Sequence, residues 1–214
     1  MNQNLNIFFY KLILRLKTKI YFNNLIKWSR VNLKKSHFII SFDFETQRDI
    51  DVISTLTEKL VEIDIVPFYA IPGELILKNL VLIKKLSNTI TFINHGFKTH
   101  TKYCTKTKKN YSSYSYVNRP KSEIFDDIRK ADEVFKKNLK KKSYIFRTPH
   151  FGEFCEKNNM NIIYNIVSEL GYKVSLSTSP IYSLVHYPVY YKKDIMEIPC
   201  NAYIKIPRQI IDSW

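Results

Sequence analysis

The chain alternates short runs of apolar residues with longer segments in which apolar residues recur every three or four positions. The short runs have the length and composition of buried strands. They lie at residues 37–42, 66–70, 89–93, 144–146, 173–177 and 195–198. Helical spacing is found at residues 49–63, 74–86, 122–139 and 161–170. Strands that alternate with helices predict an α/β fold with a mainly parallel sheet or barrel. The polar segment 102–120 is predicted to be a long loop.

The N-terminal segment, residues 1–35, is predicted to be a basic amphipathic helical unit that precedes a domain of residues 36–214. Between residues 7 and 28 a broad apolar face is interrupted by basic residues at every fourth position, from Lys11 to Lys19. These charges leave no run of ~20 apolar residues for a membrane span and no clean core for a signal peptide. Two interpretations stay open: a helix packed on its own domain with its lysines extended to water, or a helix on an anionic membrane surface.

Composition excludes a disordered chain, because 45% of the 214 residues are hydrophobic. Lys and Arg number 34 and Asp and Glu 19, which gives a net charge of +15. Nucleic-acid binders gather such charge on one face with aromatic residues, whereas the basic runs here are dispersed, for example at 106–109 and 136–142. We therefore expect no specific nucleic-acid partner. Cys104, Cys155 and Cys200 form no CxxC pair, which favours a reducing compartment over a zinc ribbon or a disulfide scaffold.

Residues with chemically active side chains directly follow three of the predicted strands. Asp43 and Glu45 follow the first strand, His95 and then His100 follow the third, and Arg147 follows the fourth. Parallel α/β barrels have their active sites at the carboxyl ends of the strands. Because side chains alternate along an extended chain, Asp43 and Glu45 point to the same side. Two carboxylates and two imidazoles can bind a divalent metal, with Zn²⁺ the best fit, and leave one carboxylate as a base.

Three motifs, in this order, resemble those of the polysaccharide deacetylases, the NodB-homology or family 4 carbohydrate esterases. The first family motif, roughly Thr-Phe-Asp-Asp or Phe-Asp-x-Asp/Glu, is similar to Ser-Phe-Asp-Phe-Glu at residues 41–45. The second, a histidine pair often preceded by Asn, is similar to Asn-His-Gly-Phe-Lys-Thr-His at residues 94–100. The third, Arg-x-Pro-Tyr-Gly or a variant, is similar to Arg-Thr-Pro-His-Phe-Gly at residues 147–152. The resemblance covers roughly residues 37–200 and implies a distorted (β/α) barrel of about seven, mainly parallel strands.

The resemblance also implies a role for each matching residue. Asp43 would be the catalytic base, and Arg147 would orient it by ion pairing. Glu45, His95 and His100 would hold the divalent metal, which is expected to be Zn²⁺. The reaction would be hydrolysis of an N-acetyl group, which yields acetate and a free amino sugar.

The chain departs from the family pattern at four places. Its two histidines are five residues apart instead of four, so either the loop between them bulges or one ligand differs. Ser175 occupies a position where the fourth motif commonly has Asp. His150 replaces a tyrosine, and the backbone N–H near it would help to hold the oxyanion. The last motif should supply a histidine as general acid, but no histidine follows His186. Either His186 or His150 substitutes, or the acid step is weak, or the chain lacks a terminal segment.

We expect an enzyme, a metal-dependent carbohydrate N-deacetylase that acts on a carbon–nitrogen bond other than a peptide bond. Its expected substrate is an N-acetylated, lipid-linked precursor of a surface polysaccharide or lipopolysaccharide. The expected location is cytoplasmic, with residues 7–28 in peripheral contact with the inner face of the membrane. The alternative is a catalytically degenerate relative that binds carbohydrate, which the altered fourth motif and the missing last histidine favour. A basic nucleic-acid-binding protein is a third interpretation, motivated only by the charge of +15.

Overall fold

The computed structural model describes residues 39–117, 119–150, 157–178 and 189–199, together with the isolated positions 23 and 27. The predicted N-terminal helical segment and the candidate acid His186 lie outside the described residues, apart from those two positions. Within the described part of the chain, no helix is both long enough and apolar enough to cross a bilayer.

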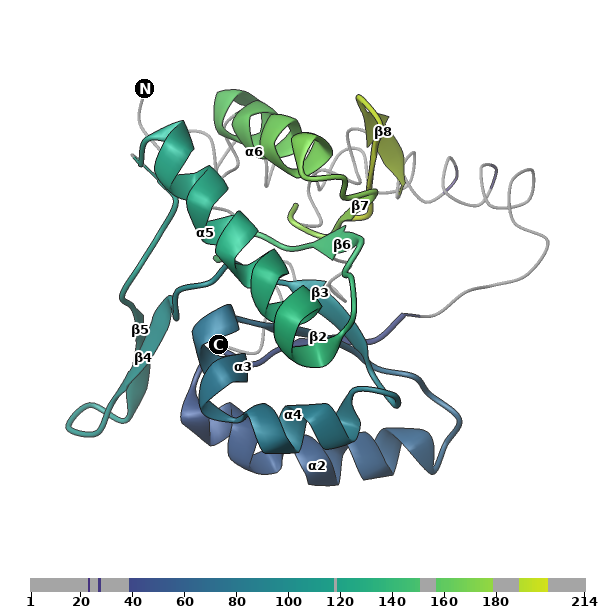
Figure 1. The fold of residues 1–214 in the computed structure, drawn as a ribbon, viewed down its shortest axis with the longest axis vertical. Helices are drawn as coiled ribbons and strands as arrows, with labels where there is room; N and C mark the ends of the chain where they lie inside the picture. Colours follow the sequence, from purple (N-terminus) through teal and green to yellow (C-terminus); the bar gives the residue numbers. More distant parts are fainter. Residues whose placement is uncertain are drawn as a thin grey trace.

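Seven of the described strands form one sheet, in the order β1-β2-β3-β6-β7-β9-β8 (Figure 1). Their bounds are β1 Ser41–Asp43, β2 Phe68–Ile71, β3 Thr91–Asn94, β6 Ile145–Phe146, β7 Val174–Ser175, β8 Tyr190–Lys192 and β9 Ile195–Glu197. All neighbours pair in parallel except β8 and β9, which are antiparallel. The predicted α/β fold with a mainly parallel sheet of about seven strands is confirmed. The consecutive order of the parallel strands is the winding of a (β/α) barrel.

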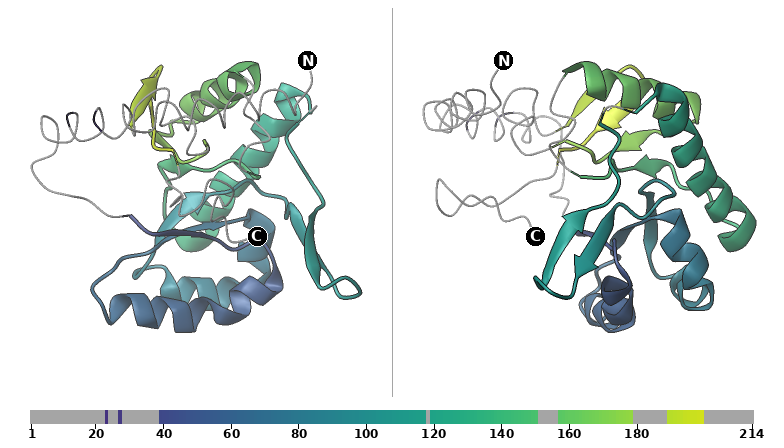
Figure 2. Two further views of the ribbon diagram at one scale, coloured as in Figure 1. Left: turned by 180° about the vertical axis from the view of Figure 1, so that it is seen from behind. Right: turned by 90° about the vertical axis from the view of Figure 1, so that its left-hand side faces the viewer.

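The helices lie outside the sheet, on one side of it (Figure 2). Their bounds are α2 Gln47–Val61, α3 Gly73–Lys78, α4 Leu80–Leu86, α5 Lys121–Val134 and α6 Lys157–Glu169. This placement follows from right-handed crossovers between consecutive parallel strands, since each crossover returns on the same side of the sheet. The helices do not cover the carboxyl ends of the strands, where parallel α/β barrels have their active sites.

Apolar packing fixes the helices against the sheet. Helix α2 buries Ile50 and Ile53 completely or almost so, and they pack with Tyr69 of β2 and Phe92 of β3. Burial of each such side chain contributes about 1.5–3 kcal/mol. A second cluster, which includes Phe146 of β6, joins β6 to α5 and α6. The two clusters hold the carboxyl ends of β1, β3 and β6 at the same edge of the sheet.

The structure differs from the sequence prediction in the segment expected to be one long loop. Here β4 (Thr101–Cys104) and β5 (Lys109–Ser112) form an antiparallel hairpin that projects from the body of the molecule in every view (Figures 1 and 2). All four residues of β5 are exposed. Strands without a buried face carry no alternation of apolar and polar residues, so the pattern gave no signal for them.

Two predicted helices are also subdivided. The helix expected at residues 74–86 breaks at Asn79, whose backbone leaves the helical region at φ −119° and ψ 30°. The helix expected at residues 122–139 changes at its end into a single π-helical turn, Phe135–Leu139, which closes at Lys140 in the left-handed region. Neither break involves proline or glycine, so the sequence offered no signal for it.

Candidate metal centre

Three side chains predicted as metal ligands lie together at the carboxyl edge of the sheet. Glu45 follows β1, His95 follows β3, and His100 directly precedes β4. One ligand atom from each lies within 4.8 Å of the other two, and all three residues are buried. Glu45 Oε1 is 2.7 Å from His100 Nε2 and 3.6 Å from His95 Nε2. The sheet therefore gathers residues from three separate segments into one cluster of potential ligands.

The hydrogen bonds of His95 prepare it to bind a metal. Its Nδ1 is 3.0 Å from the backbone oxygen of Arg147, an acceptor, so Nδ1 carries the proton. The lone pair is then on Nε2, which is buried and has no hydrogen-bond partner among the described residues. Metal-binding histidines commonly donate their other N–H to a carbonyl in this way. In the described part of the chain the lone pair of His95 Nε2 has no hydrogen-bond partner and lies near the Glu45 carboxylate, an arrangement that a cation bound between them would stabilise.

The surroundings of Glu45 and His100 shift the pKa of each. Burial alone would raise the pKa of Glu45, but the hydrogen bond with His100 and the nearby His95 hold it well below its usual range. Thr101 Oγ1 donates to the other carboxylate oxygen of Glu45. Burial, together with the nearby His95, lowers the pKa of His100. A charged carboxylate and neutral imidazoles are the forms that bind divalent cations.

The bulge predicted between the two histidines is present and is held by two carboxylates from helices. Asp127 of α5 accepts the backbone N–H groups of Phe97 and Lys98 at 2.9 and 3.1 Å. Glu74 of α3 accepts both the backbone N–H and the hydroxyl of Thr99, at 2.7 and 3.0 Å. These bonds satisfy the backbone N–H groups of Phe97, Lys98 and Thr99. The loop can therefore place both imidazoles in spite of its extra residue.

Gly96 permits the tight turn at the start of this bulge. Its φ of +77° lies in the region that favours glycine. A Cβ atom at this position would lie 2.5 Å from the Tyr116 hydroxyl and 2.6 Å from Asp127 Oδ2. The Tyr116 hydroxyl itself donates to Asp127 at 2.6 Å. The bulge therefore requires both a positive φ and the absence of a side chain.

Asp43, the predicted base, pairs with Arg147 instead of joining the metal cluster. The Arg147 guanidinium donates to Asp43 Oδ1 and, at 2.6 Å, to Ser41 Oγ. Its Nε donates to the backbone oxygen of Leu176 at 3.3 Å. Arg147 is 3% exposed, whereas Asp43 is 25% exposed. The arginine is thus a fixed support, and the carboxylate keeps one side open to a substrate.

His150 lies against the backbone that carries His100. Its Nε2 is 3.2 Å from the His100 carbonyl oxygen, 3.1 Å from that of Tyr114 and 3.0 Å from Ser112 Oγ. Its ring meets the His100 ring edge to face, with centroids 5.1 Å apart. His150 has a backbone φ of +56°, which is unusual for a residue other than glycine. These contacts place the His150 side chain against His100, a candidate metal ligand.

Sequence reasoning missed one acidic residue at this edge of the sheet, Glu197, which ends β9 and is fully buried. Its Oε1 accepts the backbone N–H groups of Ser177 and Thr178 at 2.9 and 3.0 Å and the Thr178 hydroxyl at 2.8 Å. Burial raises the pKa of Glu197. It lies beside Ser175, where the family pattern has its acid. Its position at the end of a predicted strand was the signal that could have found it.

The donor set of the cluster fits a catalytic divalent metal. One carboxylate and two imidazoles give three protein ligands, and catalytic zinc sites have three such ligands and an open position. Glu45, His95 and His100 would hold the ion. Imidazole and carboxylate donors suit Zn²⁺ well, with other first-row divalent ions as competitors.

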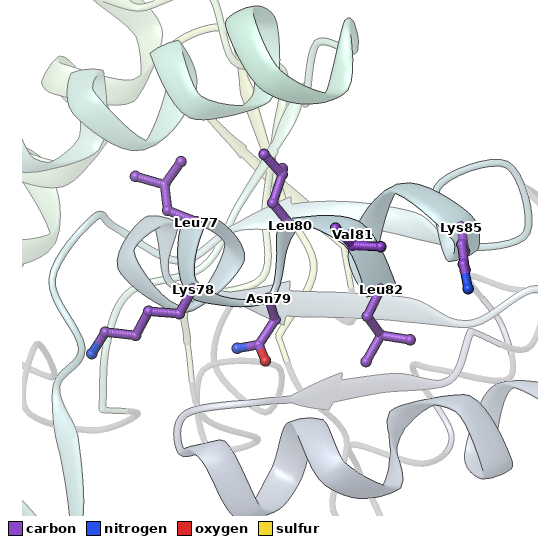
Figure 3. A pocket seen from close by; sticks show the side chains of 7 residues that line it. All are labelled: Leu77, Lys78, Asn79, Leu80, Val81, Leu82 and Lys85. Carbon is purple, nitrogen blue, oxygen red and sulfur yellow. The ribbon is translucent and has the colours of Figure 1, made fainter.

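An open hollow in the described part of the structure lies elsewhere. It has a volume of about 400 Å³ and is lined by residues 77–82 and Lys85, at the junction of α3 and α4 (Figure 3). None of the candidate ligands or catalytic residues contributes to it. The candidate metal centre and this hollow are therefore separate features of the molecule.

Similar folds occur among solved structures. A candidate polysaccharide deacetylase from Mycobacterium smegmatis matches with a TM-score of 0.56 at 13% identity, over 79% of this chain and 63% of that one. The deacetylase PplD of Streptococcus pyogenes matches with a TM-score of 0.53 at 11% identity, over 83% and 71%. A mutant of BA3943, a CE4 family pseudoenzyme, matches with a TM-score of 0.50 at 16% identity, over 68% and 44%. The chain therefore has the fold of the carbohydrate esterase family 4 deacetylases.

The likeness is one of fold and does not extend to close sequence similarity. No family model matches the sequence, and no curated protein matches it. The chain spans 43–44% of the length of the three BA3943 chains and 63% of that of the mycobacterial protein.

Proposed function

We propose that this protein is a metal-dependent carbohydrate N-deacetylase, which hydrolyses an N-acetyl group on a sugar. The observation that carries this proposal is the placement of two different carboxylates at one edge of the sheet. Glu45 lies with His95 and His100, while Asp43 lies in an ion pair with Arg147. One carboxylate is thus available as a ligand and the other as a base. The similarity of the fold to known deacetylases supports the same reading.

In the proposed mechanism Asp43 removes a proton from the attacking water. Glu45, His95 and His100 would hold a divalent cation, which would supply Lewis acidity and make that water more acidic. Arg147 holds the carboxylate in place, and the backbone N–H near His150 donates to the oxygen that becomes negative at the acetyl carbon. Cleavage of the carbon–nitrogen bond then needs a proton on the leaving nitrogen, a role we assign to His186 or His150. The products are acetate and a free amino sugar.

We further propose that the substrate is a lipid-linked saccharide precursor of a surface polysaccharide or lipopolysaccharide, reached at the inner face of a membrane from the cytoplasm. The basis is the pattern of residues 7–28, which combines a broad apolar face with basic residues. The full chain should bind vesicles with anionic lipid at low salt, and added salt should weaken this binding. Failure to bind such vesicles would leave the segment as a purely structural helix.

The proposed function is tested by metal content combined with acetate release. The purified protein, after addition of Zn²⁺, should hold about one ion per chain and release acetate from some member of a panel of N-acetylated oligosaccharides. The His95→Ala variant should lose tight metal binding and activity together, while Lys59→Ala, an exposed change on α2, should keep both. Full metal occupancy in folded His95→Ala would contradict the ligand assignment.

A catalytically degenerate, carbohydrate-binding protein is the second candidate. The observation that favours it is Ser175, which lies at the end of β7 without the acid that the family pattern has there. A CE4 pseudoenzyme among the structural relatives shows that this fold occurs without activity. Saccharide binding without acetate release, in protein that holds its metal, would favour this candidate over the enzyme.

A further inference from the structure

The hairpin that follows His100 carries an unbalanced positive charge. We call residues 101–112, which comprise β4, β5 and their turn, the basic hairpin. It contains four exposed lysines and no acidic residue, and these lysines are Lys102, Lys106, Lys108 and Lys109. None of them is within ion-pair distance of a carboxylate in the described part of the chain.

Some other basic residues of the described part of the chain lie within ion-pair distance of an acid. Such pairs are Lys59–Glu62, Arg119–Glu123, Arg129–Glu133, Lys136–Asp132 and Lys137–Glu133. Paired charges largely cancel at a distance, whereas unpaired charges of one sign create a field that attracts anions. The basic hairpin therefore carries four positive charges that no acid of its own and no ion pair in the described part of the chain offsets.

The base of the basic hairpin is fixed to the candidate metal centre. Thr101 donates to Glu45, and Ser112 Oγ lies 3.0 Å from His150 Nε2. The backbone N–H of Ser113 donates to the His100 carbonyl oxygen at 2.8 Å. The hairpin thus rises directly from two candidate active-site residues, and a molecule that reaches the metal centre passes close to it.

The strand register assigns one face of the hairpin to the metal centre. Thr101 pairs with Ser112 and Tyr103 pairs with Asn110, so these four side chains share a face. Thr101 and Ser112 touch Glu45 and His150, so Tyr103 continues the same face outward. The Arg48 guanidinium, from the first turn of α2, lies 4.0 Å from the centre of the Tyr103 ring. Arg48 is exposed and adds a fifth unpaired positive charge beside this face.

We propose that the basic hairpin and Arg48 bind an anionic group, a carboxylate or a phosphate, on the part of the saccharide that does not react. This inference rests on the proposed function and specifies the substrate class: an N-acetylated saccharide that carries acidic groups. Five positive charges attract such a chain, and the exposed Tyr111 ring, on the same face as Lys102 and Lys109, offers a surface against which a sugar can pack. The base of the hairpin, at Thr101 and Ser112, adjoins the candidate metal centre.

Binding of matched saccharides tests the proposal in the full chain. The Asp43→Asn background prevents turnover, so affinity is measured without reaction. A hyaluronan tetrasaccharide, which alternates N-acetylglucosamine with a uronic acid, is compared with neutral chitotetraose, and N-acetylglucosamine 1-phosphate is compared with N-acetylglucosamine. Tighter binding of the hyaluronan tetrasaccharide than of chitotetraose would identify a carboxylate as the bound group. Tighter binding of N-acetylglucosamine 1-phosphate than of N-acetylglucosamine would identify a phosphate. At least one of the anionic saccharides should bind more tightly than its neutral counterpart, and added salt should remove this difference in affinity.

Two matched fourfold variants complete the experiment. Replacement of Lys102, Lys106, Lys108 and Lys109 by Gln should weaken binding of the anionic saccharide about tenfold, since each exposed contact contributes little alone. Replacement of Lys130, Lys136, Lys137 and Lys140 by Gln, at the same change in charge, should leave it as it was. Equal effects of the two variants would overturn the proposal. The proposal would also be overturned if the hairpin variant lost binding to random DNA or to anionic vesicles but kept its binding to anionic saccharides.

The outcomes for the inference and for the proposed function are separable. If the wild type releases no acetate from any substrate, yet binds anionic saccharides through the hairpin, the inference stands and the enzymatic function fails. If acetate is released equally well from the neutral and the anionic member of both pairs, the function stands and the inference is overturned.

Discussion

Arg147 holds Asp43 from a position 104 residues later in the chain. The arginine is nearly inaccessible to solvent, and its donors also reach Ser41 on β1 and the carbonyl oxygen of Leu176, directly after β7. A bidentate or forked guanidinium fixed at several points cannot follow a carboxylate that moves. The pair therefore gives Asp43 one defined orientation while one side of its carboxylate stays open.

Replacement of Asp43 by Asn should separate chemistry from metal binding. Acetate release should fall by roughly 10²–10⁴-fold, the usual contribution of a general base. The metal should stay, because Glu45 and both histidines are unchanged. Rates should be compared per folded molecule, since the change leaves Arg147 without its ion-pair partner. Asp51→Asn, on the exposed side of α2, is the control. Acetate release by folded Asp43→Asn at the wild-type rate would remove Asp43 from the mechanism.

Replacement of His150 by Asn tests whether this side chain acts on the substrate or on a ligand. Asn tolerates the positive φ of the position, and the backbone N–H is kept. The support of the His100 backbone is lost, so metal affinity should fall about 10–100-fold, as for other residues behind a ligand. Titration with Zn²⁺ measures this affinity. At saturating metal the rate should recover; a persistent deficit would instead assign His150 the role of general acid.

Replacement of Gly96 by Ala should damage both stability and metal binding. The new Cβ would need a positive φ and would overlap Tyr116 and Asp127, so the free energy of unfolding should fall by more than the roughly 1–2 kcal/mol of the strained backbone alone. Gly171→Ala is a matched control: its φ is +81°, but a Cβ there meets only Lys142 Nζ, at 3.8 Å. Urea unfolding of both variants measures the difference, and equal losses would contradict the predicted clash.

Glu197 should make stability depend on pH in a direction opposite to that of an ion-paired acid. Burial raises the pKa of Glu197 from its ordinary value of 4.5, so the folded protein holds this proton more tightly than the unfolded chain. Its stabilising contribution is complete below that ordinary value and is lost as the pH rises through the raised pKa. Relative to Glu197→Gln, wild-type stability should therefore decline over this interval. Unfolding curves of both proteins from pH 4 upward test this, and curves with the same pH dependence would disprove it.

The sequence alone determined where the chemistry lies along the chain. Buried strands need runs of apolar residues, so β1, β3 and β6 were visible as such runs. Asp43, His95 and Arg147 stood directly after them. The parallel arrangement then implied that these ends meet, because right-handed crossovers return each strand in the same direction. The α/β class and the candidate residues follow from this local pattern, whereas the number of about seven strands is what the resemblance to the family implies.

Only the tertiary structure shows which contacts each of those residues makes. Alternation put Asp43 and Glu45 on the same side, but the contacts that separate them come from Arg147 and His100, far away in the chain. Glu197 meets the turn after β7 because β7 and β9 are neighbours, which no local pattern encodes. The basic hairpin has polar faces on both sides and so no hydrophobic period to reveal it. Burial of a segment can be predicted from its local pattern of apolar residues. The pairing of particular polar groups depends instead on strand order and register, which the packing of the whole chain sets.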